Sequence, residues 1–241
     1  MANQQTVEKH TLIQSILLHW FPGILVGIFY FLIRQPLQNN GFPSIFGLIL
    51  AIVFILVPVE LGYLLIMGKQ ATGRYTLDGL ISYRTAIPWW QSILWILIVL
   101  ALMGAIFTVM KPVDNFMMEN LFFWMPNLES GLDGSFSKTA LIVTYSIFAI
   151  FGVFVGPAVE ELYFRGYLLP RIPVKNSELF HSLLFAVYHF WTPWMFITRT
   201  AAMLPLIIAV KKKNIFIGIA AHILVNSLDV IVGFVFIFNL A

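Results

Sequence analysis

Two adjacent glutamates and an arginine interrupt one of the most apolar stretches of the chain, FVGPAVEELYFRGYLLP. Glu161 and Arg165 are four residues apart, so a helix would place them on one face, with the acid before the base, as an ion pair prefers. Glu160 is rotated by about 100° and has no cation on its own face. Glu160 is therefore expected to be an unpaired carboxylate in a low dielectric, which can act as a general base. From this stretch alone, a solvated helix start among lipid headgroups stays open as an alternative.

Three further polar residues fall in later apolar segments. His189 ends the stretch FAVYHF, and His222 and Asn226 share a helix face in AHILVNS. Taken singly, each has a structural explanation, such as an interfacial histidine or an interhelical hydrogen bond. Counted at 1.5 Å per residue from the predicted cytoplasmic ends of their helices, however, Glu160, His189 and His222 all lie roughly 13–17 Å deep. This common depth favours one shared site.

These side chains suit acyl transfer to water. A glutamate and a histidine can hold and deprotonate a water molecule, while a histidine N–H and an asparagine amide can stabilise the oxyanion at the attacked carbonyl. The chain has no cysteine, no HExxH zinc-protease motif and no GxSxG elbow. We therefore predict no metal and no cofactor. A zinc site of one glutamate and two histidines is chemically feasible and stays open as an alternative.

The elements that carry these residues are predicted to be membrane-spanning helices. The chain has 241 residues, of which 60% are hydrophobic and 10% charged, with a mean hydropathy of +0.89. A soluble domain has about a quarter charged residues, and a bilayer span needs about 20 apolar ones. The apolar runs lack the alternation of a β-barrel. We predict an all-α, polytopic membrane bundle of about seven transmembrane helices, with six to eight as the range and a polar site within the membrane.

The apolar runs place the spans at about 12–33, 44–67, 88–110, 139–170, 177–191, 194–210 and 214–238. One domain is expected over 1–241, with N-terminal spans in 12–110 and a motif-bearing core in 139–238. The fourth run is longer than a bilayer requires. Gly156-Pro157 in its middle predicts a kink or a helix restart.

Lysine and arginine are unevenly distributed between the two sides of this topology. With a cytoplasmic N-terminus, three of the lysines and arginines outside the spans lie on the outer side, and nine lie on the cytoplasmic side. The outer three are Arg34, Lys111 and Lys138; the cytoplasmic nine are Lys9, Lys69, Arg74, Arg84, Arg171, Lys175, Lys211, Lys212 and Lys213. The positive-inside rule then predicts an integral, multi-pass protein of the cell membrane, with its N-terminus in the cytoplasm and its C-terminus outside. This bias accounts for the net charge of +3, so we predict no nucleic-acid partner.

Three motifs in the second half of the chain resemble, in order, those of the CAAX protease and bacteriocin-processing family (CPBP or Abi), which is related to the type II CAAX prenyl endopeptidases. EELYFR resembles the family motif EExxxR, FAVYH resembles FxxxH, and HILVN resembles HxxxN. The resemblance implies an intramembrane glutamate protease with a helical core and a cavity open to the cytosol.

The resemblance also implies a role for each motif residue. Glu160 and His189 would activate the water, and His222 and Asn226 would form the oxyanion hole. The residues expected to support or shape the site are Glu161, Arg165 and Phe185.

One departure from the family lies between its second and third motifs, where many relatives have a glycine-rich span. This chain has bulkier residues and Arg199 there, so a narrower or differently shaped cavity is expected. Arg199 is expected to pair with Asp229. Glu60, an acid in the second span, has no partner that the sequence identifies.

The expected function is an intramembrane endopeptidase that cleaves a hydrophobic or lipidated peptide from the cytosolic side, near its C-terminus or within a membrane-bound segment. A prenylated CaaX tail is the best-known substrate that the resemblance suggests. Two alternatives stay open: a non-catalytic bacteriocin-immunity or regulatory membrane protein, and a zinc-dependent membrane metalloprotease. A transporter with Glu60, Glu160 and Asp229 as a proton relay would predict inverted repeats, and the sequence shows none.

Overall fold

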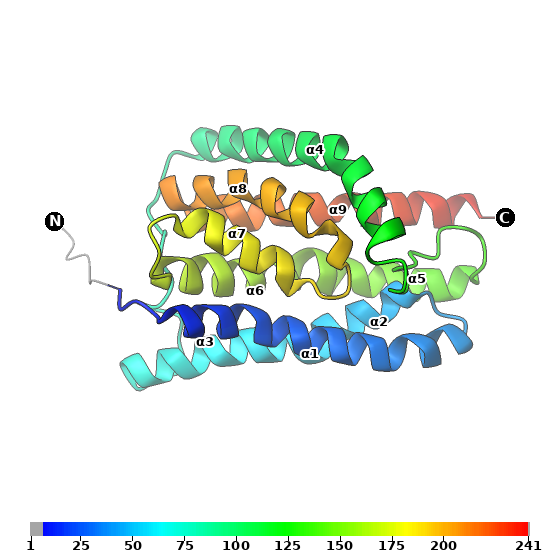
Figure 1. Ribbon diagram of the computed structural model, residues 1–241, viewed down its shortest axis with the longest axis horizontal. Coiled ribbons are helices and arrows are strands. Elements are labelled where there is room, and N and C mark those ends of the chain that lie inside the picture. Colours follow the sequence, from blue (N-terminus) through cyan, green and yellow to red (C-terminus); the bar gives the residue numbers. More distant parts are fainter. Residues whose placement is uncertain (1–6, 241) are drawn as a thin grey trace.

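The protein is a bundle of helices, as a computed structural model describes it for residues 7–240. Over these residues it contains helices and connecting segments and no strand. Six helices are long and apolar enough to cross a membrane, and they lie side by side along the horizontal axis of Figure 1. The predicted all-α, multi-pass membrane fold is therefore confirmed, with six candidate spans in the predicted range of six to eight.

The elements follow one another as α1 (Leu12–Asn39), α2 (Ser44–Ala51), η1 (Ile52–Leu56), α3 (Val57–Thr72), α4 (Trp89–Asn120), α5 (Lys138–Ile147), η2 (Phe148–Val155), α6 (Gly156–Glu160), η3 (Glu161–Leu168), η4 (Leu169–Arg171), α7 (Ser177–Tyr188), η5 (Pro193–Met195), α8 (Phe196–Lys212) and α9 (Ile215–Asn239). The segments η1, η2 and η3 are π-helical, and η4 and η5 are 3₁₀ turns. Continuous helix joins α2 to α3, and α5 to η4, into one candidate span each.

Polar side chains cap the starts of three helices. Thr11 accepts a hydrogen bond from the backbone N–H of Gln14, and the Gln14 side chain accepts one from Thr11, which makes a capping box before α1. Ser137 and Asn214 each accept a backbone N–H from the first turn of α5 and α9. These caps satisfy amides that would otherwise lack partners where each helix begins.

The fourth candidate span does not break at Gly156-Pro157, where the sequence predicted a kink or a restart, but changes there from π-helix to α-helix. Pro157 lies in the first turn of α6. The π-helical segments η2 and η3 lie directly before and after α6. π-Helical turns are rare and are frequent at functional sites, and here they flank Glu160 and Glu161.

The predicted span at 177–191 is wrong. Helix α7 has 12 residues, or about 18 Å of length, less than the roughly 30 Å of a bilayer core. The backbone leaves the helical region at His189 (φ −82°, ψ 61°), and Pro193 then begins the 3₁₀ turn η5. Helices α7 and α8 therefore form a hairpin whose tip stops short of the end that α5 and α9 reach (Figure 1).

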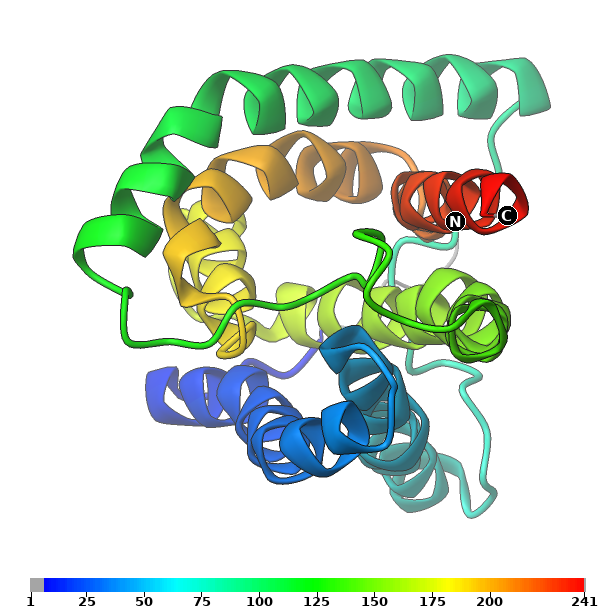
Figure 2. The ribbon, with the colours of Figure 1, turned by 90° about the vertical axis from the view of Figure 1, so that its right-hand side faces the viewer.

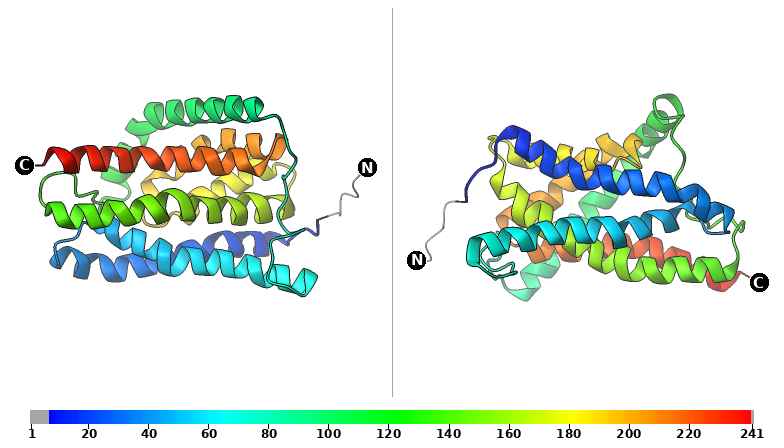
Figure 3. Two further views of the ribbon diagram at one scale, coloured as in Figure 1. Left: turned by 180° about the vertical axis from the view of Figure 1, so that it is seen from behind. Right: turned by 90° about the horizontal axis from the view of Figure 1, so that it is seen from below.

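The span from α5 to η4 lies at the centre of the bundle. Helix α9 runs beside it along its length (Figure 3), and fully buried Phe164 contacts the rings of Phe185 and Tyr188 on α7. Helix α4 lies on the outside (Figure 2), with only 11% of its most apolar window buried. Its exposed leucines and isoleucines are suited to contact with lipid.

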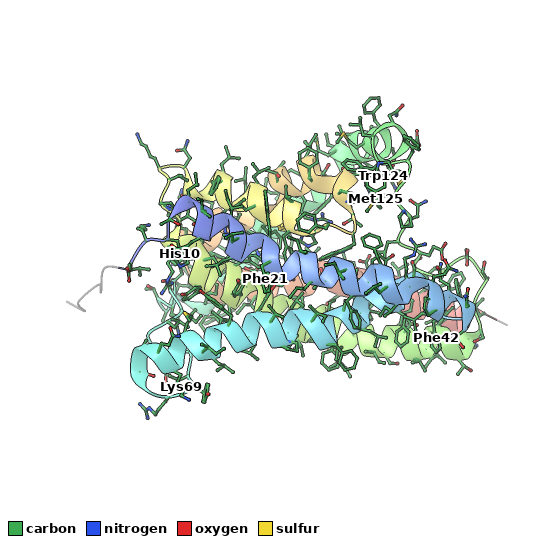
Figure 4. All side chains as sticks on the ribbon, turned by 60° about the horizontal axis from the view of Figure 1, so that its bottom comes forward. His10, Phe21, Phe42, Lys69, Trp124 and Met125 are labelled. Atoms are coloured by element: carbon green, nitrogen blue, oxygen red, sulfur yellow. The ribbon has the colours of Figure 1, made fainter. Side chains whose placement is uncertain are left out.

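The two ends of the bundle differ in charge. At one end the Lys9 ammonium donates to the carbonyl of Pro170 over 2.8 Å, and Lys211 pairs with Glu178 at 2.6 Å. Figure 4 shows Lys69 at this end and Phe42 at the opposite one. The lysines and arginines that were predicted to share one side thus share one end. Which side of the membrane this end faces, and the single-domain organisation, stay predictions.

Candidate functional site

Glu161 links two helices at the centre of the bundle. Its carboxylate lies 3.2 Å from the Arg165 guanidinium, and both side chains are fully buried, so the predicted ion pair is present. The ring of Phe185 covers the guanidinium, with 3.8 Å between Arg165 Cζ and the ring centroid. Glu161 Oε1 also lies 3.0 Å from His222 Nδ1 on α9. The sequence did not predict this second contact, because the spacing of residues along the chain does not show which helices pack against each other.

Gly218 allows α9 to approach this carboxylate closely. A Cβ atom at this position would lie 2.7 Å from Glu161 Oε2 and 2.6 Å from a methyl carbon of Val210. Gly218 is four residues before His222, so both lie on the face of α9 that contacts the central helix. The glycine therefore sets the separation at which His222 meets Glu161.

Glu160 lies on the opposite side of the same imidazole. Its Oε2 is 3.9 Å from His222 Nε2, and within the described residues no lysine or arginine lies within 4 Å of it. The side chains of Glu160 and His222 are 9% and 12% exposed, whereas those of Glu161 and Arg165 are 0% exposed. The Glu160–His222 edge of the cluster is thus the one that a water molecule can approach.

Glu60 is a further buried acid beside this site. The Tyr188 hydroxyl donates to Glu60 Oε1 over 3.1 Å and is within electrostatic reach of Glu160. The sequence signal for Glu60 was its presence in an apolar span. Tyr188 carried no comparable signal.

His189 lies at the end of α7, with its ring held by the helix itself. Its Nδ1 is 2.9 Å from the carbonyl oxygen of Phe185. Since a carbonyl only accepts, this bond places the hydrogen on Nδ1 and leaves Nε2 with a lone pair. The ring also packs edge-on against Phe185, with 4.9 Å between centroids, and lies within electrostatic reach of His222.

Asn226 lies one turn beyond His222 on α9. Its amide nitrogen donates to the carbonyl of Gly152 in the π-helical segment η2, over 2.9 Å. An asparagine amide has two N–H donors, so this bond fixes the group while one donor is left for another acceptor. The structure thus gathers Glu160, His222 and Asn226 around the central helix, with His189 near them at the tip of the α7–α8 hairpin.

The expected pair of Arg199 and Asp229 does not form. Arg199 Nη2 donates to the Thr192 hydroxyl over 3.1 Å and contacts the Met195 sulfur at 3.7 Å. Asp229 is exposed on α9, and no ion pair within 4 Å involves either residue in the described part of the chain. The prediction failed because the sequence does not show which faces two helices turn to each other.

The described residues offer no group of three histidine, aspartate or glutamate side chains that could hold a metal ion. The carboxylates of Glu160 and Glu161 lie beside different ring nitrogens of His222, Nε2 and Nδ1 respectively. A zinc ion needs at least three such groups converging on one point.

Comparison with known proteins identifies the segment that holds most of this site. Residues 138–228, less than half of the chain, match a family model described as type II CAAX prenyl endopeptidase Rce1-like. The chain carries an Rce1-like domain. The Rce1-like segment contains all three motifs from which the sequence predicted this family, and that prediction is confirmed. No curated protein and no solved structure matches the chain.

Proposed function

We propose that this protein is an intramembrane endopeptidase of the glutamate type. The observation that carries the proposal is the Glu160 carboxylate, which lies within the membrane-spanning bundle, has no lysine or arginine within 4 Å, and faces His222 at 3.9 Å. An intramembrane acid without a cationic partner is a functional candidate by default. The Rce1-like segment supports peptide-bond hydrolysis as the reaction.

Water activation is assigned to Glu160 and His189. The Glu160 carboxylate and the lone pair on His189 Nε2 are both acceptors, so a water molecule between them can donate one hydrogen to each. As the water oxygen bonds to the substrate carbonyl carbon, one of these groups takes its proton. The carbon–nitrogen bond then breaks, and the proton passes to the leaving amine.

The oxyanion that forms at the attacked carbonyl needs hydrogen-bond donors. Asn226 has a second amide N–H for this role, because its first is bonded to Gly152. His222 donates its Nδ1 hydrogen to Glu161, so it must also carry a hydrogen on Nε2 to serve as a donor. The carboxylates on both sides of the ring, Glu160 and Glu161, would support such a doubly protonated imidazole.

The substrate is proposed to be a hydrophobic peptide, lipidated as the family description suggests, that is cleaved from the cytosolic side. The concentration of lysine and arginine at one end of the bundle supports a cytosolic position for that end. The hairpin of α7 and α8 begins and finishes at this end, and the substrate is proposed to reach its tip, with His189, from there.

The deciding experiment measures cleavage of a farnesylated CaaX peptide by the purified protein in proteoliposomes, with products identified by mass spectrometry. Replacing a general base typically lowers the rate by about 10²–10⁴-fold, so this loss is expected for Glu160→Gln. Full activity of this variant would exclude Glu160 as the base.

Asp229→Asn is the matched control, since it makes the same change at an acid on α9 that lies outside the cluster. It should cleave at the wild-type rate. A parallel treatment with a zinc chelator tests the metal alternative, because loss of cleavage that added zinc restores would favour it. Binding of the peptide without cleavage would instead support a non-catalytic role.

A further inference from the structure

Arg199 is a cation within a candidate span whose contacts are all uncharged. Its Nη2 atom bonds to the Thr192 hydroxyl and touches the Met195 sulfur. Its Nη1 atom is buried and has no hydrogen-bond partner. Among the residues that the structure describes, no carboxylate lies within 4 Å of the guanidinium. A cation within a membrane span normally has an anionic partner. The Arg199 guanidinium is therefore available for an anion from outside the chain.

Arg199 lies beside the proposed catalytic residues. Thr192, which accepts its hydrogen bond, donates its backbone N–H to the carbonyl of His189 over 3.0 Å. Two hydrogen bonds therefore connect the guanidinium to the backbone of His189. The guanidinium is also within electrostatic reach of Glu160 and of the His189 ring.

The nearest acids on the chain leave Arg199 without an ion pair. Asp114 on α4 is within electrostatic reach, but its Oδ1 accepts the hydroxyl of Thr198 over 2.5 Å and it lies beyond ion-pair distance of the guanidinium. Glu160 is the other acid in reach, and it faces His222 instead. Both acids are thus within electrostatic reach of Arg199, and neither forms an ion pair with it.

We propose that Arg199 binds the C-terminal carboxylate of the peptide substrate. A guanidinium presents two parallel N–H donors that match the two oxygens of a carboxylate, and the pair is strengthened where water is scarce. The inference rests on the proposed function, and it makes the protein selective for scissile bonds a few residues before a free C-terminus. A peptide cut far from its end would leave this guanidinium without an anion.

The test compares two farnesylated CaaX peptides that differ only at the C-terminus, one a free acid and the other an amide. In proteoliposomes the wild-type protein should cleave the acid with a kcat/KM about 10–100-fold higher, as expected for one charge-assisted hydrogen bond. Arg199→Gln should lose this preference, because its kcat/KM for the acid falls about 10–100-fold more than its kcat/KM for the amide. Arg199→Lys, which keeps the charge, should recover part of the preference for the acid.

Three results would overturn the assignment. The wild-type protein could cleave both peptides equally, or Arg199→Gln could keep the preference. If Arg199→Gln lowered kcat/KM equally for both peptides, Arg199 would instead be assigned to stabilising the oxyanion or to packing. Thermal unfolding and size-exclusion profiles of each variant identify losses that come from misfolding.

A binding measurement separates this inference from the proposed function. In a Glu160→Gln background, fluorescence anisotropy of the labelled acid and amide peptides reports binding without cleavage. The acid should bind about 10–100-fold more tightly, and adding Arg199→Gln should remove the difference. If the wild-type protein cleaves neither peptide, the proposed function fails, while this comparison still decides the role of Arg199. Equal binding of the acid and the amide would exclude the carboxylate site.

Discussion

At the scale of single residues, Glu160 and Glu161 are adjacent in the chain but have different surroundings. Glu161 is fully buried between Arg165 and His222, so its carboxylate has a cation on one side and an imidazole nitrogen at hydrogen-bond distance on the other. Glu160 has only the imidazole beside it, and its side chain is 9% exposed. Glu161 is therefore suited to holding the structure together, and Glu160 to reacting with a water molecule.

This difference predicts that replacing each glutamate by glutamine changes the free energy of unfolding by very different amounts. Glu161→Gln leaves the Arg165 guanidinium buried without a counter-charge, which typically destabilises a protein by about 3–5 kcal/mol. Glu160→Gln leaves no lysine or arginine without its counter-charge, so it should destabilise the protein much less than Glu161→Gln does. Denaturant titrations of both variants in the same detergent check this. Equal destabilisation would contradict the division between the two glutamates.

The Tyr188 hydroxyl is predicted to matter for both stability and cleavage. Tyr188→Phe keeps the buried ring but leaves Glu60 Oε1 without its donor, an effect worth about 1–3 kcal/mol. Cleavage should fall about tenfold or more, because this hydroxyl is also within electrostatic reach of Glu160.

Tyr75→Phe is the control for this prediction, since its hydroxyl contacts only Lys69 on the exposed surface. It should change neither the free energy of unfolding nor the cleavage rate. Wild-type stability and cleavage in Tyr188→Phe would show that the buried hydroxyl is dispensable.

At the scale of elements, the approach of α9 to the central helix decides where His222 lies. Because a Cβ on Gly218 would lie 2.6 Å from Val210 and 2.7 Å from Glu161, Gly218→Ala must push the helices apart or displace the carboxylate. Overpacking of this kind costs about 1–3 kcal/mol. Cleavage should fall as well, because His222 moves with α9.

Gly62→Ala is the matched control, since a Cβ on this helical glycine meets nothing within 4 Å. Alanine is the better helix former by about 0.5–1 kcal/mol, so this variant should be as stable as the wild type or slightly more so. Thermal unfolding and the peptide cleavage assay compare the two variants. A harmless Gly218→Ala would mean that α9 does not need this close approach.

At the scale of the whole molecule, the arrangement of the α7–α8 hairpin can be tested by labelling. The chain has no cysteine, so a single introduced cysteine is the only thiol that can react with a maleimide. With a membrane-impermeant maleimide, Lys175→Cys and Lys212→Cys should react from one side of the membrane and Ser135→Cys from the other. Phe190→Cys, at the hairpin tip, should not react from the side that labels Ser135→Cys.

The tip residue is the informative one in this experiment. Two full spans would also return residue 212 to the side of residue 175, but they would place Phe190 at the far surface. Labelling of Phe190→Cys from the Ser135 side would therefore restore the span predicted at 177–191. Reaction of Lys175→Cys from the cytoplasmic side would support the predicted orientation.

The sequence predicted the membrane-spanning helices and most of the candidate site for identifiable reasons. Long apolar runs form helices in a bilayer, because the backbone N–H and C=O groups must be hydrogen-bonded within the segment where no water is present. The pair of Glu161 and Arg165 was predictable because a separation of four residues is a neighbouring position on one helix. The common depth of Glu160, His189 and His222 followed from the fixed rise of a helix.

Other features depended on contacts between helices, for which the chain has no local code. The sequence determined that this is a helical membrane protein and which charged residues are held within it, since hydropathy and helical periodicity are local properties. Only the tertiary structure decided that His222 lies between Glu160 and Glu161, that Glu60 meets Tyr188, and that α7 stops within the bundle. The physical reason is that helix faces are matched by packing side chains such as Gly218 and Val210 against each other, which neither composition nor spacing specifies.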